Sequence, residues 1–490
     1  MHSDRQRAAA SAVNRFGLGA RPGDLERIGD PQTWLLAQID HPADGAVWLA
    51  GLPSSVDYLR REAQLRRQLQ ELRREGTAVK PAAATGPGAK PVNPFVRLYR
   101  RAFGEDLRQE AVARWRIAAG TGTPFAERLV RFWSNHFAVS VDKGPARLYA
   151  APLEREAIRP HFAGRFLDML LAVETHPAML RYLDQAQSVG PDSMLAMRAD
   201  RRLARIARGK DQPARRLGIN ENLAREIMEL HTLGAGSGYT QADVTEFARA
   251  LAGWSLPFPR QIERDGITSA FVYRPAAHEP GTRLVLGKRY PNTGFDQARA
   301  ILADLAAHPA TARHLSFELA RHFVADDPPP PLVERLAAVY RRAGGQLSAV
   351  YAELIRAPES WTQAAVKFRT PQDYVVAGLR AGSMRIGHRP QPYEGLLARL
   401  GQPTFMPRSP AGFSDVAGDW IAPDALWKRV QTAEALAERV PRAGLDPASF
   451  ARALLGPQLR AATTAAIARA EARQQAIAIV FASPEFQWRA

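Results

Sequence analysis

The chain has 490 residues, which is enough for two or three domains or for one large domain with insertions. A hydrophobic fraction of 46% is typical of a globular protein and excludes a disordered one. The formal net charge is +17, and nearly all of the positive charge is arginine because only seven residues are lysine.

This positive charge raises the question of nucleic-acid binding. The arginines, however, are spread along the whole chain, and many stand near Glu or Asp at helical spacing, as Arg249 does after Glu246. Such a distribution does not favour a general nucleic-acid-binding role. The sequence has no run of about 18 apolar, uncharged residues, so no transmembrane helix is predicted.

Two further features bear on chemistry and compartment. The absence of cysteine excludes disulfides, thiolate metal sites and a cysteine nucleophile. The N-terminus has only a short apolar stretch, Ala8–Val13, and lacks the features of a signal peptide. The sequence as written predicts a cytoplasmic protein, and the alternative is export with a partner or after loss of a leader.

The first 75 residues are predicted to form a group of N-terminal helices. Two short helices are expected within 5–40, separated by Gly17-Leu18-Gly19, and one solvated amphipathic helix at 55–76. The Ala-, Gly- and Pro-rich stretch 76–93 predicts a flexible linker or loop. The main helical domain is then expected to span 94–490.

Apolar periodicity predicts helices through most of this main domain. A basic stretch with Gly and Pro at 190–218 predicts a mobile loop with a helical patch. Thr240 and Asp243 are expected to start a helix with a capping box, in which the hydroxyl accepts from a free backbone N–H. The expected helices are 95–119, 125–136, 152–171, 177–183, 220–233, 240–254, 294–307, 309–324, 330–343, 347–356, 371–382, 391–399, 423–439, 448–454 and 458–481.

One segment, 265–292, breaks the helical pattern. Ile267–Tyr273 and Arg283–Leu286 are rich in strand-forming residues and flank His278-Glu279-Pro280-Gly281. They predict a small antiparallel hairpin packed on the helices. The predicted fold class is therefore mainly α, as one large multi-helix domain with a small antiparallel β-hairpin insertion.

Polar residues gather in three segments. One is the end of the helix 125–136, with Asn135 and His136; the second is the helix 220–233; the third is the loop with His278. These segments carry a resemblance to a known family, together with several shorter motifs. The motifs are Tyr239-Thr240-x-x-Asp243, Gly253-Trp254, His308-Pro309-x-Thr311-Ala312, Gly401-Gln402-Pro403 and Ser409-Pro410-x-Gly412-Phe413.

The chain resembles the bacterial domain-of-unknown-function family numbered 1800, from about Val13 to about Glu438. Two departures are small: Glu279 follows His278 where the family usually has Asp, and Phe413 stands where Trp or Tyr is common. The resemblance implies no particular reaction. It does imply a partner, a protein of a second family numbered 1501, whose members are often exported.

On the helix 220–233, an advance of 100° per residue places Leu223, Ile227 and Leu230 on one buried stripe. A polar stripe then runs along its edge, formed by Asn222, Glu226 and Glu229. His231 falls on the opposite flank, about 140° from Glu226. This helix alone therefore cannot bring Glu229 and His231 to one metal ion, although its carboxylates could meet a histidine from elsewhere.

Each candidate residue also has a structural interpretation. Arg225 and Glu229 are four residues apart and could form a surface ion pair, and His231 could cap free helix carbonyls. His136 could be a core histidine, whereas His278 stands in a Pro/Gly loop, where side chains often serve function. The aromatic residues Trp133, Phe137 and Trp254 are expected in the core.

Two hypotheses follow from the sequence. The first is a binding or accessory partner of an exported or envelope-associated protein, because no catalytic motif is present. The second is a hydrolytic or oxidative enzyme with a divalent metal or an acid–base site. Its predicted residues are His136, Glu226, Glu229, His231 and His278, with Asn135, Asn222 and Arg225 as further polar candidates.

Overall fold

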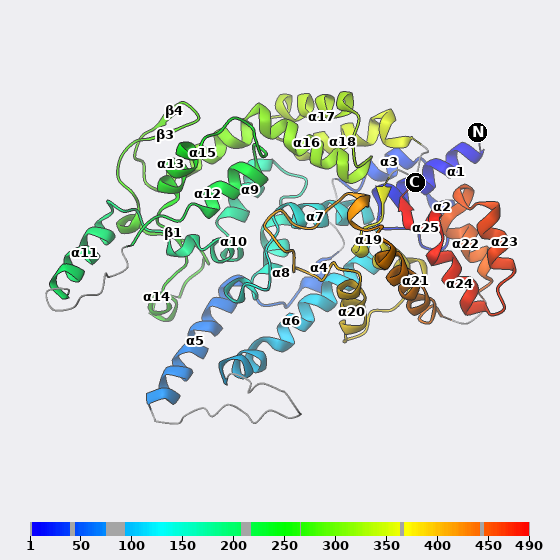
Figure 1. The fold of residues 1–490 in the computed structure, drawn as a ribbon, viewed down its shortest axis with the longest axis horizontal. Coiled ribbons are helices and arrows are strands. Elements are labelled where there is room, and N and C mark those ends of the chain that lie inside the picture. The colour runs from blue at the N-terminus through cyan, green and yellow to red at the C-terminus, as the bar shows by residue number, and fades with distance from the viewer. Residues whose placement is uncertain are drawn as a thin grey trace.

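The computed structural model describes residues 2–39, 45–74, 94–206, 217–264, 266–362, 367–441 and 445–489. Over these ranges, 63% of the chain is helical, with 25 α-helices and three small two-stranded antiparallel sheets (Figure 1). This confirms the predicted mainly-α fold class. The predicted flexible linker at 76–93 lies outside the described residues, as does the part of the predicted mobile loop from 207 to 216.

The helices of the first half begin with α1, which continues into a π-helical turn at Ala12–Phe16. Their bounds are α1 His2–Ser11, α2 Asp24–Arg27, α3 Pro31–Leu36, α4 Ala46–Leu49, α5 Ser55–Arg74, α6 Pro94–Gly120, α7 Pro124–His136, α8 Ala150–Pro152, α9 Phe166–Glu174, α10 Pro177–Tyr182, α11 Met194–Ile206, α12 Asn222–Glu226, α13 Gln241–Leu251 and α14 Pro259–Arg264. The predicted capping box is confirmed at the start of α13, where Thr240 and Asp243 bond to each other's backbone N–H.

The second half is a succession of helices close to the predicted ones. They are α15 Phe295–Ala307, α16 Pro309–Phe323, α17 Pro330–Arg342, α18 Leu347–Arg356, α19 Pro371–Ala381, α20 Gln391–Arg399, α21 Pro423–Ala437, α22 Pro447–Leu455, α23 Ala461–Ala468, α24 Arg473–Ala482 and α25 Pro484–Gln487. The predicted single helix 458–481 is divided in two, because the chain turns between Ala468 and Arg473.

The strands are short, and their pairing differs from the prediction. Strand β2 (Val272–Tyr273) pairs with β1 (Trp254–Ser255), and the hairpin joins β3 (Arg283–Val285) to β4 (Lys288–Tyr290). The reason lies in the turn Leu286-Gly287, where both residues have positive φ, as a tight two-residue hairpin requires. This turn joins β3 to the next segment of the chain, which is too polar to stand out as a strand.

The helix predicted at 220–233 has an irregular second half. After α12, residues Ile227–His231 form a π-helical turn, which is wider than an α-turn. The 100° rule therefore fails after Glu226. His231 lies in the core with 1% exposure, and Leu230 reaches the central cavity described below.

Two large apolar cores hold the fold together. One extends over α7, α9, α12, α13 and α15–α18; the other joins α1 and α19 to α21–α24. The predicted core aromatics Trp133, Phe137 and Trp254 are all 0% exposed, which confirms that prediction. Figure 1 shows α7 and α19 near the centre of the molecule, between α16–α18 and the C-terminal helices. The candidate site lies where these central elements meet.

Candidate functional site

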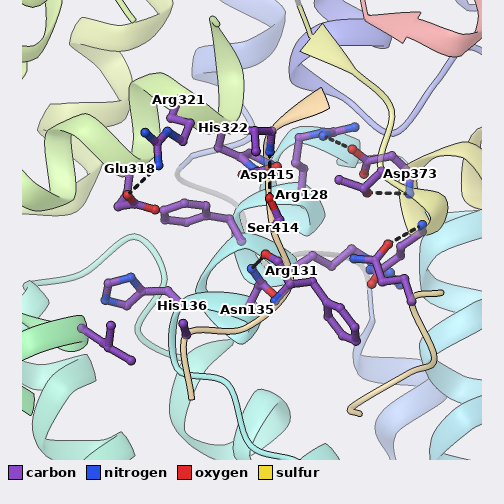
Figure 2. A pocket seen from close by; sticks show the side chains of 18 of the residues that line it. Arg128, Arg131, Asn135, His136, Glu318, Arg321, His322, Asp373, Ser414 and Asp415 are labelled. Atoms are coloured by element: carbon purple, nitrogen blue, oxygen red, sulfur yellow. Dashed lines mark hydrogen bonds and ion pairs between the residues drawn. The ribbon is translucent and has the colours of Figure 1, made fainter. Parts of the chain in front are cut away.

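A central cavity of about 300 Å³ lies between α7, α16, the start of α19 and the segment 411–416 (Figure 2). Its lining is unusually rich in titratable side chains for a protein interior. These side chains are Arg128, Arg131, His136, His314, Glu318, Arg321, His322, Asp373 and Asp415.

The segment 411–416 is docked on α7 by a reciprocal pair of hydrogen bonds. Asn135 donates from Nδ2 to the carbonyl of Phe413 at 2.9 Å, and its Oδ1 accepts from the Phe413 N–H at 2.8 Å. Gly412 lies against the same residue, since a Cβ at this position would stand 2.4 Å from the Asn135 carbonyl oxygen. Two motifs 278 residues apart therefore meet here, and the contact places Asp415 in the cavity wall.

His322 and Asp415 form a buried pair. Nδ1 of His322 lies 2.5 Å from Oδ2 of Asp415, and the two side chains are 12% and 16% exposed. Burial lowers the pKa of His322 despite the neighbouring carboxylate. The neutral ring then carries its proton on Nδ1, which donates to Asp415. Nε2 is buried and has no hydrogen-bond partner in the described part of the chain.

Two carboxylates of the cavity, those of Asp373 and Asp415, are held in the ionised form by their buried partners. Burial by itself would raise the pKa of Asp415, but the hydrogen bond from His322 and the charges of Lys367 and Arg489 outweigh it and hold that pKa well below its usual range. Asp373 behaves similarly, because Arg128 donates to its Oδ2 at 3.0 Å and Arg489 lies near. Both carboxylates are therefore acceptors only.

Two other histidines of the cavity face the π-helical turn. Nε2 of His136 lies 3.3 Å from the carbonyl of His231, and Nε2 of His314 lies 3.0 Å from that of Leu230. A carbonyl oxygen can only accept, so each Nε2 carries the proton. The irregular turn leaves these carbonyls free, and the two histidines satisfy them. Burial lowers the pKa of both rings, which are therefore neutral.

Among the described residues that line the cavity, Glu318 is the carboxyl without a strong cationic partner. The nearest cation is Arg321, with Nη1 at 3.8 Å from Oε1. Burial raises the pKa of Glu318, and this guanidinium offsets the effect only in part. Glu318 and His322 are four residues apart on α16 and so share one face of the helix. The cavity thus brings together a carboxyl whose pKa is raised and a histidine whose pKa is lowered.

The structure brings only some of the predicted site residues together. His136 lies beside His231, with ring centroids 6.1 Å apart. His231 in turn donates from Nδ1 to Glu174 at 2.8 Å, in a pair that is almost fully buried. Glu226 is half-buried, and this burial raises the pKa of its carboxyl. Neither Glu226 nor Glu229 lines the cavity.

The other polar candidates of this helix lie toward the surface. Arg225 contacts Glu221 and Gln241, at 3.2 and 2.8 Å, and not Glu229 as the spacing suggested. Gln241 is the first residue of α13, so its contact with the Arg225 guanidinium joins two helices. The spacing within one helix could not predict this contact. Asn222 is exposed. Asn135 is the polar candidate that reaches the cavity.

His278 lies away from the cavity and is packed more tightly than a loop position suggests. It is 7% exposed, and both ring nitrogens have protein partners: Nδ1 lies 3.1 Å from the carbonyl of Ala252, and Nε2 lies 3.2 Å from Oδ1 of Asn292. The ring of Tyr273 packs against it. These contacts tie the loop to α13 and the β-hairpin.

The described residues contain no group of three or more His, Asp or Glu side chains placed to hold a metal ion. The arrangement of His136, Glu226, Glu229 and His278 therefore gives no support to the predicted divalent-metal site. An acid–base catalytic site, in contrast, does not require three ligands gathered around a metal ion.

Sequence reasoning missed His314, Glu318, His322 and Asp415. The first three had a signal, because they repeat at every fourth residue along the helix predicted at 309–324 and so form a titratable stripe. Asp415 had none. Its position depends on how the segment 411–416 docks on α7, and no local spacing encodes that contact.

Comparisons with known proteins give one result. No curated protein and no solved structure matches the chain. A family model does match, over residues 11–488. The match extends past Glu438, where the sequence resemblance ended, through the C-terminal helices to the first residue of β6 (Trp488–Arg489). Because this match covers nearly the whole chain, the protein belongs to the family described as "Protein of unknown function (DUF1800)".

Proposed function

We propose that the protein is an acid–base enzyme acting on a small molecule in the central cavity. The observation that carries this proposal is the buried His322–Asp415 pair, which faces the same cavity as Glu318. A carboxylate that accepts from Nδ1 orients the imidazole and leaves Nε2 as a base, and this arrangement recurs in many enzymes. The cavity volume suits a small polar substrate.

The proposed roles follow from the pKa directions. Neutral His322 is the general base, and Asp415 orients its ring and stabilises the imidazolium that forms. Glu318 is the general acid, since burial raises its pKa and so favours the neutral form that can donate a proton. Arg321, 3.8 Å from Glu318, is placed to hold an acceptor group of the substrate.

Replacing His322 by Gln is expected to lower turnover about 100-fold, the contribution of one general base. The measurement is a screen of generic ester, amide, phosphodiester and glycoside substrates, followed by assay of the variant on whichever class is turned over. His161→Gln is the matched control, because His161 does not line the cavity. A screen without any turnover, or a variant with the wild-type rate, would contradict the proposal.

We also propose that α21 docks a partner protein, for which the resemblance implies a member of the family numbered 1501. Three apolar side chains, Leu426, Trp427 and Val430, are 43%, 63% and 39% exposed on this helix. Neighbouring exposed apolar residues are typical of interaction sites.

The helices of the described ranges include none with the length and apolar character of a membrane span.

Trp427→Glu is expected to weaken capture of such a partner about tenfold, because an exposed Trp is a common interface anchor. The measurement is copurification of coexpressed chains, which also shows the compartment in which the pair is found. Trp48→Glu is the matched control, since Trp48 is 44% exposed but lies on α4. If Trp427→Glu and Trp48→Glu captured the partner equally well, the exposed face of α21 would not be the docking site.

A further inference from the structure

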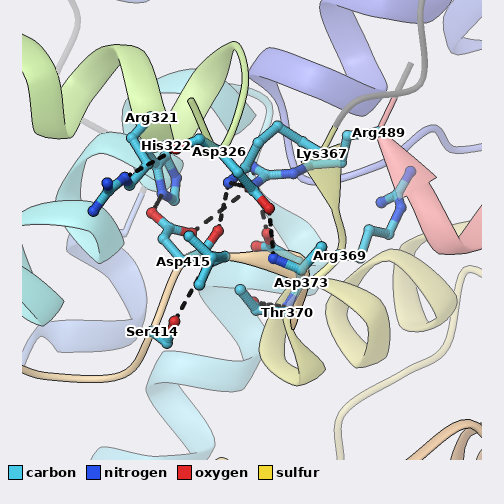
Figure 3. Close-up of polar contacts among 12 residues, drawn as sticks. Arg321, His322, Asp326, Lys367, Arg369, Thr370, Asp373, Ser414, Asp415 and Arg489 are labelled. Carbon is cyan, nitrogen blue, oxygen red and sulfur yellow. Dashed lines mark hydrogen bonds and ion pairs between the residues drawn. The ribbon is translucent and has the colours of Figure 1, made fainter. Parts of the chain in front are cut away.

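A second cluster of charges lies behind the cavity wall that Asp373 and Asp415 form. In the sheet of β5 (Lys367–Phe368) and β6, Lys367 lies opposite Arg489. Arg369 continues the same pairing, two residues beyond Lys367. Because alternate residues of a strand share one face, these three cations project together. Figure 3 shows them gathered with three carboxylates, those of Asp326, Asp373 and Asp415.

Several N–H groups of this cluster are buried and have no hydrogen-bond partner in the described part of the chain. Arg369 and Arg489 are both 0% exposed. Among the described residues, Nε and Nη1 of Arg369 and all three guanidinium nitrogens of Arg489 make no hydrogen bond, and neither does Nη2 of Arg128. A buried donor without an acceptor destabilises the folded protein, and more so when it is charged. Such a group in a folded protein calls for a water or an ion.

The charges of the cluster do not balance either. Lys367 pairs with Asp326, and Arg128 and Arg489 share Oδ2 of Asp373, at 3.0 and 3.5 Å. Arg489 also lies 4.0 Å from Asp415.

Within the described ranges, no ion pair joins Arg369 to a carboxylate. Its Nη2 donates to the neutral Oδ1 of Asn14 at 2.9 Å. With Lys367, Arg128 and Arg489, it makes four cations against three carboxylates. Arg429, which is buried and donates from Nη2 to the Arg369 carbonyl at 2.6 Å, adds a further cation, so the positive charges outnumber the negative ones. Burial and the nearby guanidinium groups lower the pKa of Arg369 to about 9, a sign of how poorly its charge is compensated.

We propose that this cluster binds one monovalent anion of halide size, with chloride as the ligand, between Arg369 and Arg489. A halide accepts several N–H groups at once and offsets part of the excess positive charge. Water would accept the same hydrogen bonds but would leave that charge unchanged. Because Arg489 and Asp373 are linked, the bound anion would also steady the wall of the cavity, although the proposal does not depend on the proposed acid–base chemistry.

The direct test is anomalous scattering from crystals grown in bromide in place of chloride. We expect a bromine peak within hydrogen-bonding distance of Arg369 and Arg489. Ordered waters at these donors without an anomalous peak would overturn the proposal. This measurement uses the wild-type protein and does not require any variant to fold.

The test in solution measures the melting temperature against chloride concentration, with gluconate holding the ionic strength constant. A ligand that binds only the folded state raises the melting temperature with its concentration. We expect this response in the wild type and in Arg299→Gln, whose exposed side chain pairs with Asp296, and its loss in Arg369→Gln. A wild type indifferent to chloride, or an Arg369→Gln variant with the full response, would refute the site.

Discussion

Asp373→Asn is expected to lower the free energy of unfolding by about 3–5 kcal/mol at neutral pH, the usual loss when one partner of a buried ion pair is removed. Arg128 and Arg489 both direct Nη1 to Oδ2 of Asp373, and both guanidinium groups are buried. Asn keeps the shape of the side chain but removes the charge that compensates them. Denaturant unfolding of the two proteins measures the difference.

The same variant has a defined pH dependence. The pKa of Asp373 lies below its usual range in the folded protein, because the charges of Arg128 and Arg489 outweigh the effect of burial. Its stabilising contribution is therefore complete above the pKa of an unfolded Asp, about 4, and is lost as the pH falls toward the folded pKa. The difference in the free energy of unfolding between the wild type and Asp373→Asn should therefore become smaller below about pH 4.

The control for this prediction is Asp424→Asn on α21. Asp424 also pairs with a cation, Lys428 at 2.9 Å, but its side chain is 72% exposed. Exposed pairs contribute little to stability, so this variant should unfold like the wild type at every pH. A similar loss in both variants would mean that burial does not set the strength of the Asp373 contacts.

The sequence could predict elements that depend on local pattern. Apolar spacing located the helices from α15 to α22 within a few residues, and the Thr240–Asp243 pair located the start of α13. Prediction failed where backbone geometry changed without a compositional sign. The π-helical turn at Ile227–His231 is the clearest case. The predicted directions of Glu226, Glu229 and His231 assumed a regular α-helix, with an advance of about 100° per residue.

The candidate site was harder to predict because it is assembled from segments distant in sequence. His136 and Asn135 were found through the motif that carries them, and both line the cavity. Glu318 and His322 were visible as a stripe on one helix, but a stripe alone does not tell which face is buried. Asp415 reaches His322 only through the docking of Phe413 on Asn135. Tertiary contacts of this kind leave no spacing to detect.

Gly412→Ala is expected to undo this docking and to lower the free energy of unfolding by about 2–5 kcal/mol. Gly412 has φ +77°, a region that costs other residues about 1–2 kcal/mol. Its new methyl group would also stand 2.4 Å from the Asn135 carbonyl oxygen and 2.8 Å from Oδ1. These are positions that only a shift of the segment can relieve, at a further cost of about 1–3 kcal/mol. The measurements are denaturant unfolding and limited proteolysis of the segment 409–416.

The control is Gly395→Ala in α20, where a Cβ would meet nothing within 4 Å. Alanine is the better helix former, so this variant should be as stable as the wild type or more stable by up to about 1 kcal/mol. Displacement of the segment in Gly412→Ala would also carry Asp415 away from His322, so the turnover attributed to His322 should fall with it. If Gly412→Ala kept both its stability and its turnover, the segment would not be held against α7 by the Asn135 contacts, and Asp415 would need another route to the cavity.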